Sequence, residues 1–237
     1  MTLPFFFTAA IPAGATITLD EVASKHIVQV LRMQNGEALR LTDGKGSLYT
    51  ASITDNNRKK CVVHIEHTAN MPPVLPKVTI AISLLKNSSR FEWFLEKATE
   101  LGVNEIVPLI CTRTEKQHFR YERMHGILVS AMLQSQQVWL PQLHEPVKLD
   151  AFIASQPDAA TKYIAHCEKE ENKQLLPVIQ QQHNSNSVLL IGPEGDFTTH
   201  EIALALQQQF KPVSLGNTRL RTETAGIVGA ALLCSVR

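Results

Sequence analysis

Glycine, charged and hydroxyl residues gather in two short stretches near the carboxyl-terminal end of the chain. The first is residues 192–198, with two glycines and two acids, and the second is residues 215–225, which contains Arg219 and Arg221. Each stretch follows an apolar run that is typical of a buried strand. Because glycine lets a backbone approach a ligand closely and helix N-termini offer unpaired N–H groups, we predict a binding site at these two loops.

The two loops are expected to leave the same end of neighbouring strands. In open α/β sheets, ligands bind in the crevice outside the carboxyl ends of the strands. The first loop lacks the glycine pattern of a dinucleotide site and the Gly-Lys-Ser/Thr ending of a triphosphate loop, so a nucleotide phosphate is not the expected ligand. Thr198 and Glu201 predict a capping box that begins a helix directly after this loop.

The bulk composition predicts a folded protein without a strong net charge. Its 237 residues, 44% of them hydrophobic, suffice for one large domain or two modest ones. The 23 Lys and Arg residues nearly balance the 22 Asp and Glu residues, so any RNA contact must depend on local patches. The apolar start is too short for a signal peptide or a membrane span, and we expect a cytoplasmic protein with no membrane partner.

The four cysteines are widely spaced and contain no Cys-x-x-Cys pair. They lie in or beside apolar runs, which predicts reduced, buried thiols and no metal site. These residues are Cys61, Cys111, Cys167 and Cys234.

The first part of the chain has a β-like pattern, from residue 5 to about residue 69. Alternating apolar residues flank the turn at residues 43–46, which predicts a hairpin. Three prolines within residues 70–76 mark a stiff linker or a domain boundary. We therefore predict a small β domain at residues 1–71 and a second domain at residues 72–237. The charge count of the first domain leaves two interpretations open, an RNA-binding surface and an ordinary solvated face.

Strand and helix patterns alternate throughout the second part of the chain, which predicts an α/β domain with a mostly parallel sheet. The last helix carries a stripe of small residues, Gly226, Gly229 and Ala230, which permits close packing within the core or across a dimer. The expected strands are residues 78–85, 105–110, 163–166, 188–191 and 213–215, and the expected helices include residues 91–101, 121–138 and about 175–181.

Basic and aromatic residues are interleaved in residues 113–123. This mixture suits neutralisation of an RNA backbone together with stacking on an unpaired or flipped nucleotide. Glu115 and Glu122 dilute the signal, so the alternative is the solvated start of a helix. The basic candidates are Arg113, Lys116, Arg120 and Arg123.

Taken together, these motifs resemble the RsmE family, the bacterial 16S rRNA uracil-N3 methyltransferases of the SPOUT superfamily. The resemblance covers nearly the whole chain and rests on residues 189–195, 215–216, 220–225, 97–103, 134–135, 30–32, 36–37 and 43–46. The chain departs from the family pattern at a few positions. Asp196 stands where a second glycine is usual, Leu133 replaces a glutamate, Gln136 and Gln137 replace Gly-Arg, and Thr218 sits where arginine is common.

The resemblance implies an amino-terminal PUA-like β-barrel domain that binds RNA and a carboxyl-terminal SPOUT α/β domain with a deep trefoil knot. It also implies S-adenosyl-L-methionine as the cofactor and a homodimer with its sites at the interface. The implied activity is methylation of N3 of a specific uridine in 16S rRNA, within the small ribosomal subunit. Two alternatives are a non-catalytic RNA-binding protein of the same fold and an enzyme that methylates a ribose 2′-hydroxyl or another base.

Arg221 is the expected catalytic residue, because a fixed cation stabilises the negative charge that spreads over uracil when N3 loses its proton. The alternative for Arg221 is a structural ion pair with Glu194 or Glu223. His166 either lines a third loop or packs at the end of its strand. The expected cofactor contacts are His166, Ile191, Gly192, Glu194, Gly195, Leu215, Gly216, Leu220 and Thr222, and the expected RNA contacts are Arg32, Arg113, Lys116, Arg120 and Arg123.

Overall fold

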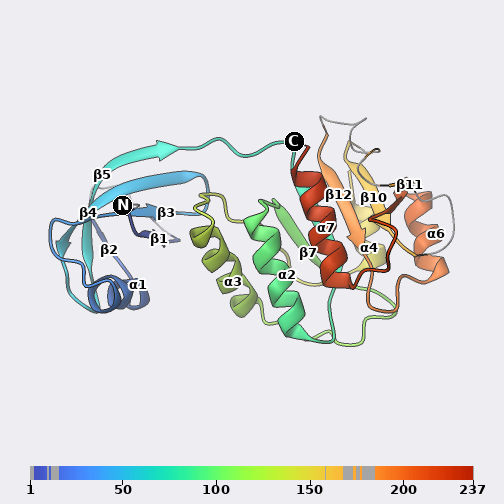
Figure 1. The fold of residues 1–237 in the computed structure, drawn as a ribbon, viewed down its shortest axis with the longest axis horizontal. Helices are drawn as coiled ribbons and strands as arrows, with labels where there is room; N and C mark the ends of the chain where they lie inside the picture. Colours follow the sequence, from blue (N-terminus) through green and yellow to red (C-terminus); the bar gives the residue numbers. More distant parts are fainter. Residues whose placement is uncertain are drawn as a thin grey trace. The chain divides into compact units, whose positions relative to one another are not determined.

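The computed structural model describes residues 3–9, 11, 16–157, 159–167, 173–174, 177 and 185–236. The chain divides into two compact units (Figure 1). The first comprises residues 1–73 and 132–140, and the second comprises residues 74–131 and 141–237.

The first unit is built on a five-stranded sheet with the order β1-β3-β4-β5-β2. The β3 and β4 strands pair antiparallel on either side of residues 43–46, so the predicted hairpin is confirmed. Asp43 Oδ1 closes the turn by accepting hydrogen bonds from the N–H groups of Lys45 and Ser47, at 2.8 and 3.3 Å. The elements are β1 (Phe5–Phe7), β2 (Thr16–Thr18), α1 (Glu21–Lys25), the π-helix η1 (His26–Val30), β3 (Ala38–Thr42), β4 (Ser47–Asp55) and β5 (Val62–Asn70).

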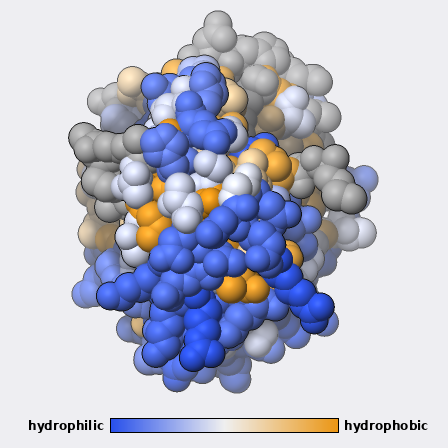
Figure 2. Space-filling model, turned by 90° about the vertical axis from the view of Figure 1, so that its left-hand side faces the viewer, coloured by the Kyte–Doolittle hydropathy of each residue, from blue (hydrophilic) through white to orange (hydrophobic). Residues whose placement is uncertain are grey.

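Alternate residues of these strands form the apolar core of the first unit. Leu39 and Leu41 of β3 and Val63 of β5 are fully buried, and Ile27 of η1 packs with them. The face drawn in Figure 2 is mostly hydrophilic, with a few hydrophobic residues exposed between the polar ones. The first unit therefore buries its own core, while Val22, Val30, Leu31 and Met71 are among its exposed hydrophobic residues.

The α3 helix (Tyr121–Gln134) ends four residues before the predicted bound at residue 138, so that bound is wrong. Gln136 adopts a left-handed conformation with φ 59°. Its N–H group donates to the Leu133 carbonyl, and the N–H group of Gln137 donates to the Met132 carbonyl. This is the hydrogen-bond pattern of a Schellman helix end, here with glutamine where glycine is usual.

The second unit contains an eight-stranded sheet with the order β11-β13-β10-β12-β6-β7-β8, and β9 also pairs with β7. Each of its pairings is parallel, which confirms the predicted mostly parallel sheet. The helix expected at about residues 175–181 falls outside the described residues except at residue 177. The other elements are β6 (Val78–Ser83), α2 (Ser88–Glu100), β7 (Glu105–Ile110), β8 (Gln142–Leu143), β9 (Val147–Lys148), α4 (Leu149–Ser155), β10 (Thr161–Ala165), β11 (Lys173–Gln174), β12 (Ser187–Ile191), α6 (Thr199–Gln207), β13 (Lys211–Ser214) and α7 (Thr222–Cys234).

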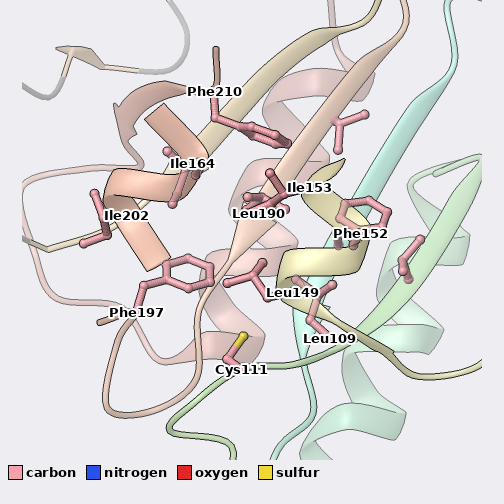
Figure 3. Close-up of a cluster of buried hydrophobic side chains, with 14 residues drawn as sticks. Leu109, Cys111, Leu149, Phe152, Ile153, Ile164, Leu190, Phe197, Ile202 and Phe210 are labelled. Atoms are coloured by element: carbon pink, nitrogen blue, oxygen red, sulfur yellow. The ribbon is translucent and has the colours of Figure 1, made fainter. Parts of the chain in front are cut away.

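Helices cover both faces of this sheet. Side chains alternate along each strand, so neighbouring residues of one strand pack against helices on opposite faces. Leu189 of β12 meets Gly229 of α7, on the face where α7 also packs against α2. Leu190 points the other way, into a cluster with Phe152 of α4 and Ile202 of α6 (Figure 3). The small-residue stripe of α7 thus serves core packing in this chain.

One expectation about the sheet is wrong. The two glycine-bearing loops follow β12 and β13, but these strands are not neighbours, because β10 lies between them and pairs in parallel with both. All three strands run in the same direction, so their loops still emerge at one edge of the sheet. The loop that begins at His166 is consequently placed between the two predicted loops.

The expectation of four buried thiols is only partly met. Cys61 and Cys111 are buried, whereas Cys167 is exposed and Cys234 is half-buried. Cys167 follows β10 and therefore lies in the loop at the edge of the sheet. Within the described part of the chain, no helix is long and apolar enough to cross a membrane.

Candidate active site

The carboxyl ends of β10, β12 and β13 border two connected cavities of about 280 and 490 Å³. Both cavities are lined by Ala165, Cys167, Arg219, Leu220 and Ala225. The smaller one adds the loop after β12, and the larger one adds the loop after β13. The site predicted from two loops is therefore built from three.

The structure brings together eight of the nine residues expected to contact a cofactor. Gly195 is the exception, because it lines neither cavity, and a Cβ built there would lie 3.3 Å from Arg113 Cδ. Arg221 lines the smaller cavity. The eight residues that line the cavities are His166, Ile191, Gly192, Glu194, Leu215, Gly216, Leu220 and Thr222.

The loop after β12 turns sharply around Phe197. Gly192 allows this turn, since a Cβ there would approach the Phe197 ring to 3.1 Å. Asp196 is left-handed with φ 65°, and its Oδ1 accepts a hydrogen bond from the Phe197 N–H group at 2.8 Å. Its other oxygen, Oδ2, accepts from the Cys167 N–H group at 2.8 Å.

The predicted capping box after this loop is confirmed. Thr198 caps α6, and the buried carboxylate of Glu201 accepts from the Thr198 N–H group at 2.8 Å. Glu201 Oε1 also accepts from the Thr112 N–H group, in the loop after β7. Burial alone would raise the pKa of Glu201, but the hydrogen bonds from Thr198 and Thr112 together hold it below its usual value.

Arg113 holds the same loop from its other side. Its Nη1 donates to the carbonyl oxygens of Gly195 and Phe197, at 2.6 and 3.3 Å. The guanidinium group that the sequence predicted as an RNA contact is thus engaged with the loop that borders the smaller cavity.

Arg221 lies at the position that precedes the first turn of α7, and its side chain does not cap the helix. Among the described residues, it makes no ion pair with Glu194 or Glu223. Glu223 is buried and instead lies near Arg90, with 3.7 Å between Oε1 and Nε. The positive group of Arg221 is consequently exposed at the cavity rather than neutralised by either predicted partner.

The loop after β13 and the loop after β10 complete the walls. Gly216 has φ 150°, and its carbonyl accepts a hydrogen bond from Ser214 Oγ at 2.8 Å. His166 is buried directly after β10 and lines the larger cavity. His166 therefore lines the cavity from the third loop and is also packed at the end of its strand.

The candidate RNA contacts differ in their surroundings, because some are paired with other side chains and others are exposed. Arg123 makes a two-point ion pair with Glu92 on α2, at 2.6 and 2.9 Å. Arg120 Nε donates to His118 Nε2 at 3.2 Å, and Lys116 is exposed. Arg32 belongs to the first unit, where it is exposed and left-handed with φ 56°.

Three charged or reactive residues of the cavities were not predicted as site residues of any kind. Cys167 and Arg219 line both cavities, and Asp196 lines the smaller one. Burial and the neighbouring Asp196 carboxylate raise the pKa of the Cys167 thiol, while Arg219 opposes that shift. Asp196 could have been predicted from its place within the glycine-bearing loop. Predicting Cys167 would have required knowing the position of β10 in the sheet.

Comparisons with known proteins agree with this arrangement. Residues 72–234 match the family model described as an RNA methyltransferase domain, and residues 19–66 match an RNA methyltransferase PUA domain. The ribosomal RNA small subunit methyltransferase E of Synechocystis sp. is 33% identical over 223 residues, which cover 92% of this chain and 72% of that protein.

Two solved structures resemble the fold over its whole length. The probable rRNA-methyltransferase of Porphyromonas gingivalis has 38% identity and a TM-score of 0.91, over 99% of this chain and 98% of that one. The ribosomal RNA small subunit methyltransferase E of Neisseria gonorrhoeae, bound to S-adenosyl methionine, has 28% identity and a TM-score of 0.88, over 98% and 97%.

Proposed function

This chain belongs to the ribosomal RNA small subunit methyltransferase E family, the RsmE family, and we propose that it methylates N3 of a specific uridine in 16S rRNA. The methyl donor is S-adenosyl-L-methionine. The observation that carries the proposal is the pair of connected cavities at the carboxyl ends of β10, β12 and β13, lined by eight of the nine residues expected to hold the cofactor.

The chemistry of the cavity walls fits this donor. The larger cavity, of about 490 Å³, is in the size range of small-molecule sites, and Ile191, Leu215 and Leu220 supply apolar walls. Glu194 offers negative charge to a sulfonium or ammonium group, and Arg219 offers positive charge to a carboxylate. When bound, S-adenosyl-L-methionine supplies an electrophilic methyl group.

Arg221 is proposed as the catalytic residue. Uracil N3 carries a proton in its neutral form, and loss of that proton spreads negative charge over the ring and its carbonyl oxygens. A guanidinium group fixed at the cavity stabilises that charge without rearranging as the reaction proceeds. The remaining work of the site is to align the base with the methyl group and to exclude water.

RNA recognition is proposed for both predicted domains. Residues 1–71 would bind RNA with Arg32, and residues 72–237 would bind it with Arg113, Lys116, Arg120 and Arg123 while transferring the methyl group. Among these, the exposed Lys116 is free to meet a phosphate, whereas Arg123 would first have to leave Glu92. Within residues 72–237, the strongest RNA contact is therefore expected from Lys116.

The proposal extends to the setting of the reaction. We expect a homodimer acting in the cytoplasm on 16S rRNA, within the small ribosomal subunit. The trefoil knot implied by the family belongs to the same proposal.

The test supplies methyl-labelled S-adenosyl-L-methionine and the purified protein to small ribosomal subunits from cells that lack this protein. Mapping by mass spectrometry should find one label, on N3 of a uracil in 16S rRNA. A label on a ribose 2′-hydroxyl would favour the alternative enzyme of the same superfamily. Absence of transfer, together with RNA binding, would favour the non-catalytic alternative.

A further inference from the structure

Asp196 joins two of the three loops that border the cavities. Its Oδ2 accepts a hydrogen bond from the Cys167 N–H group at 2.8 Å, and Cys167 is the second residue after β10. Its Oδ1 accepts from the Phe197 N–H group at 2.8 Å within its own loop. One carboxylate therefore satisfies a backbone donor on each of the two loops.

The loop that carries Asp196 is fixed on both sides of it. Phe197 is 1% exposed and points into the cluster formed with Ile202 and Phe210 (Figure 3). Arg113 binds the carbonyl oxygens of Gly195 and Phe197. Because its neighbours are anchored, Asp196 presents its carboxylate in one orientation and can restrain Cys167 rather than follow it.

We propose that Asp196 is a positioning residue for the methyl donor: it holds the start of the loop after β10 against the loop after β12, so that both line one cavity before the donor binds. This inference rests on the proposed function. A site that is already assembled binds its ligand more tightly, because less ordering remains for the bound state to impose. Hydrogen bonds that involve a charged acceptor are the stronger kind, which suits this task.

A simpler explanation of Asp196 is its backbone conformation. At φ 65° a non-glycine residue is uncommon, and aspartate and asparagine tolerate this region better than most side chains do. If conformation were the only reason for the residue, glycine would serve equally well or better. If the two hydrogen bonds matter, glycine removes both, and asparagine keeps only one carbonyl acceptor.

The experiment measures binding of S-adenosyl-L-methionine by isothermal titration calorimetry, and methyl transfer to small ribosomal subunits, for wild type, Asp196→Gly and Asp196→Asn. The matched control is Gln209→Gly, because Gln209 has the same φ of 65° and precedes β13, at the end of that strand remote from the cavities. Amide hydrogen exchange at Cys167 is followed by mass spectrometry in the absence of the donor.

Asp196→Gly should bind the donor about tenfold more weakly or worse, with Asp196→Asn intermediate and Gln209→Gly unchanged. The KM for the donor should rise, while kcat at saturating donor stays within about twofold, because Asp196 acts through the Cys167 backbone. Exchange at the Cys167 amide should be faster in both Asp196 variants. Should Asp196→Gly fail to fold, Asp196→Asn carries the same test.

Equal donor affinity in wild type and Asp196→Gly would overturn the inference, and so would a fall in kcat at unchanged KM. If either result is obtained while the wild-type protein transfers methyl groups normally, the inference fails but the proposed function remains. Failure of wild type itself to bind the donor would instead remove the proposed function, and this inference with it.

A thiol measurement checks the contact independently. Alkylation of Cys167 by iodoacetamide is followed in a Cys234→Ser background, since Cys61 and Cys111 are buried. The Asp196 carboxylate raises the pKa of the Cys167 thiol, so both Asp196 variants should form more thiolate and react faster at pH 8. An unchanged rate would contradict the proximity on which the inference depends.

Discussion

Arg113 Nη1 lies 2.6 Å from the carbonyl oxygen of Gly195, so the basic segment that follows β7 is fastened to the loop that follows β12. The same guanidinium reaches the Phe197 carbonyl at 3.3 Å. A charged donor to two backbone acceptors restrains the loop more than a neutral donor would. The segment expected to bind RNA is therefore hydrogen-bonded to a loop that borders the cavity expected to hold the methyl donor.

Replacing Arg113 by alanine is predicted to weaken binding of S-adenosyl-L-methionine by about tenfold, because two hydrogen bonds to the loop are lost. The matched control is Lys116→Ala, which removes a basic residue of the same segment that is exposed. That control should weaken RNA binding and reduce its salt dependence while leaving donor affinity unchanged. Calorimetry with the donor and filter binding with rRNA separate the two effects. Identical behaviour of the two variants would show that Arg113 has no special role at the loop.

Replacing Gly226 by alanine is predicted to destabilise the protein by about 1 to 3 kcal/mol, because the new Cβ would lie 2.7 Å from Phe94 Cε2 and 2.9 Å from Ile82 Cδ1. Gly126→Ala is the control on α3, where a Cβ meets nothing within 4 Å. That substitution should stabilise the protein by about 0.5 to 1 kcal/mol, through helix propensity. Urea denaturation measures both. A neutral Gly226→Ala would mean that α7 does not pack against α2 and β6 as described.

Glu201→Gln is predicted to lower the free energy of unfolding at pH 7 by about 1 to 2 kcal/mol, since glutamine cannot accept from both Thr198 and Thr112 through two oxygens. The pKa of Glu201 is lowered from 4.5 in the folded state. Its charged form therefore stabilises the protein above the unfolded pKa, and that contribution disappears as the pH falls through the folded pKa. Denaturation measured between pH 7 and pH 3 should show the gap between wild type and variant closing below about pH 4.5. A difference in the free energy of unfolding that stays constant with pH would show that the stabilisation does not come from the carboxylate charge.

Arg221→Ala is predicted to lower kcat for methyl transfer by about 100-fold, because the developing charge on the base loses its fixed cation. Arg221→Lys should recover part of that loss, since lysine keeps the charge but lacks the planar fork. Donor affinity, measured by calorimetry, should change much less than kcat in both variants. Full turnover by Arg221→Ala would remove Arg221 from the chemistry.

Local patterns predicted most of the second unit. The continuous apolar runs of β6, β7 and β12 are typical of strands buried on both faces, and the structure places all three in the parallel sheet. Thr198 and Glu201 predicted the start of α6, because a capping box depends only on residues three apart. Features set by short-range geometry were thus available from the sequence.

Long-range pairing was not available in the same way. Alternation of strand and helix predicts a parallel sheet but not its order, so the insertion of β10 between β12 and β13 was missed. Cys167 was expected to be buried because it follows an apolar run, but it lies past the end of β10, in a cavity wall. The end of α3 was missed because Gln136 takes the left-handed position where glycine is the usual signal.

The most direct measurement is a crystal structure of the protein soaked with S-adenosyl-L-methionine. Electron density for the donor is predicted in the connected cavities, between Gly192 on the loop after β12 and Gly216 on the loop after β13, with room for the base beside Arg221. Density at another place on the molecule, with these cavities unfilled at saturating donor, would contradict the central claim.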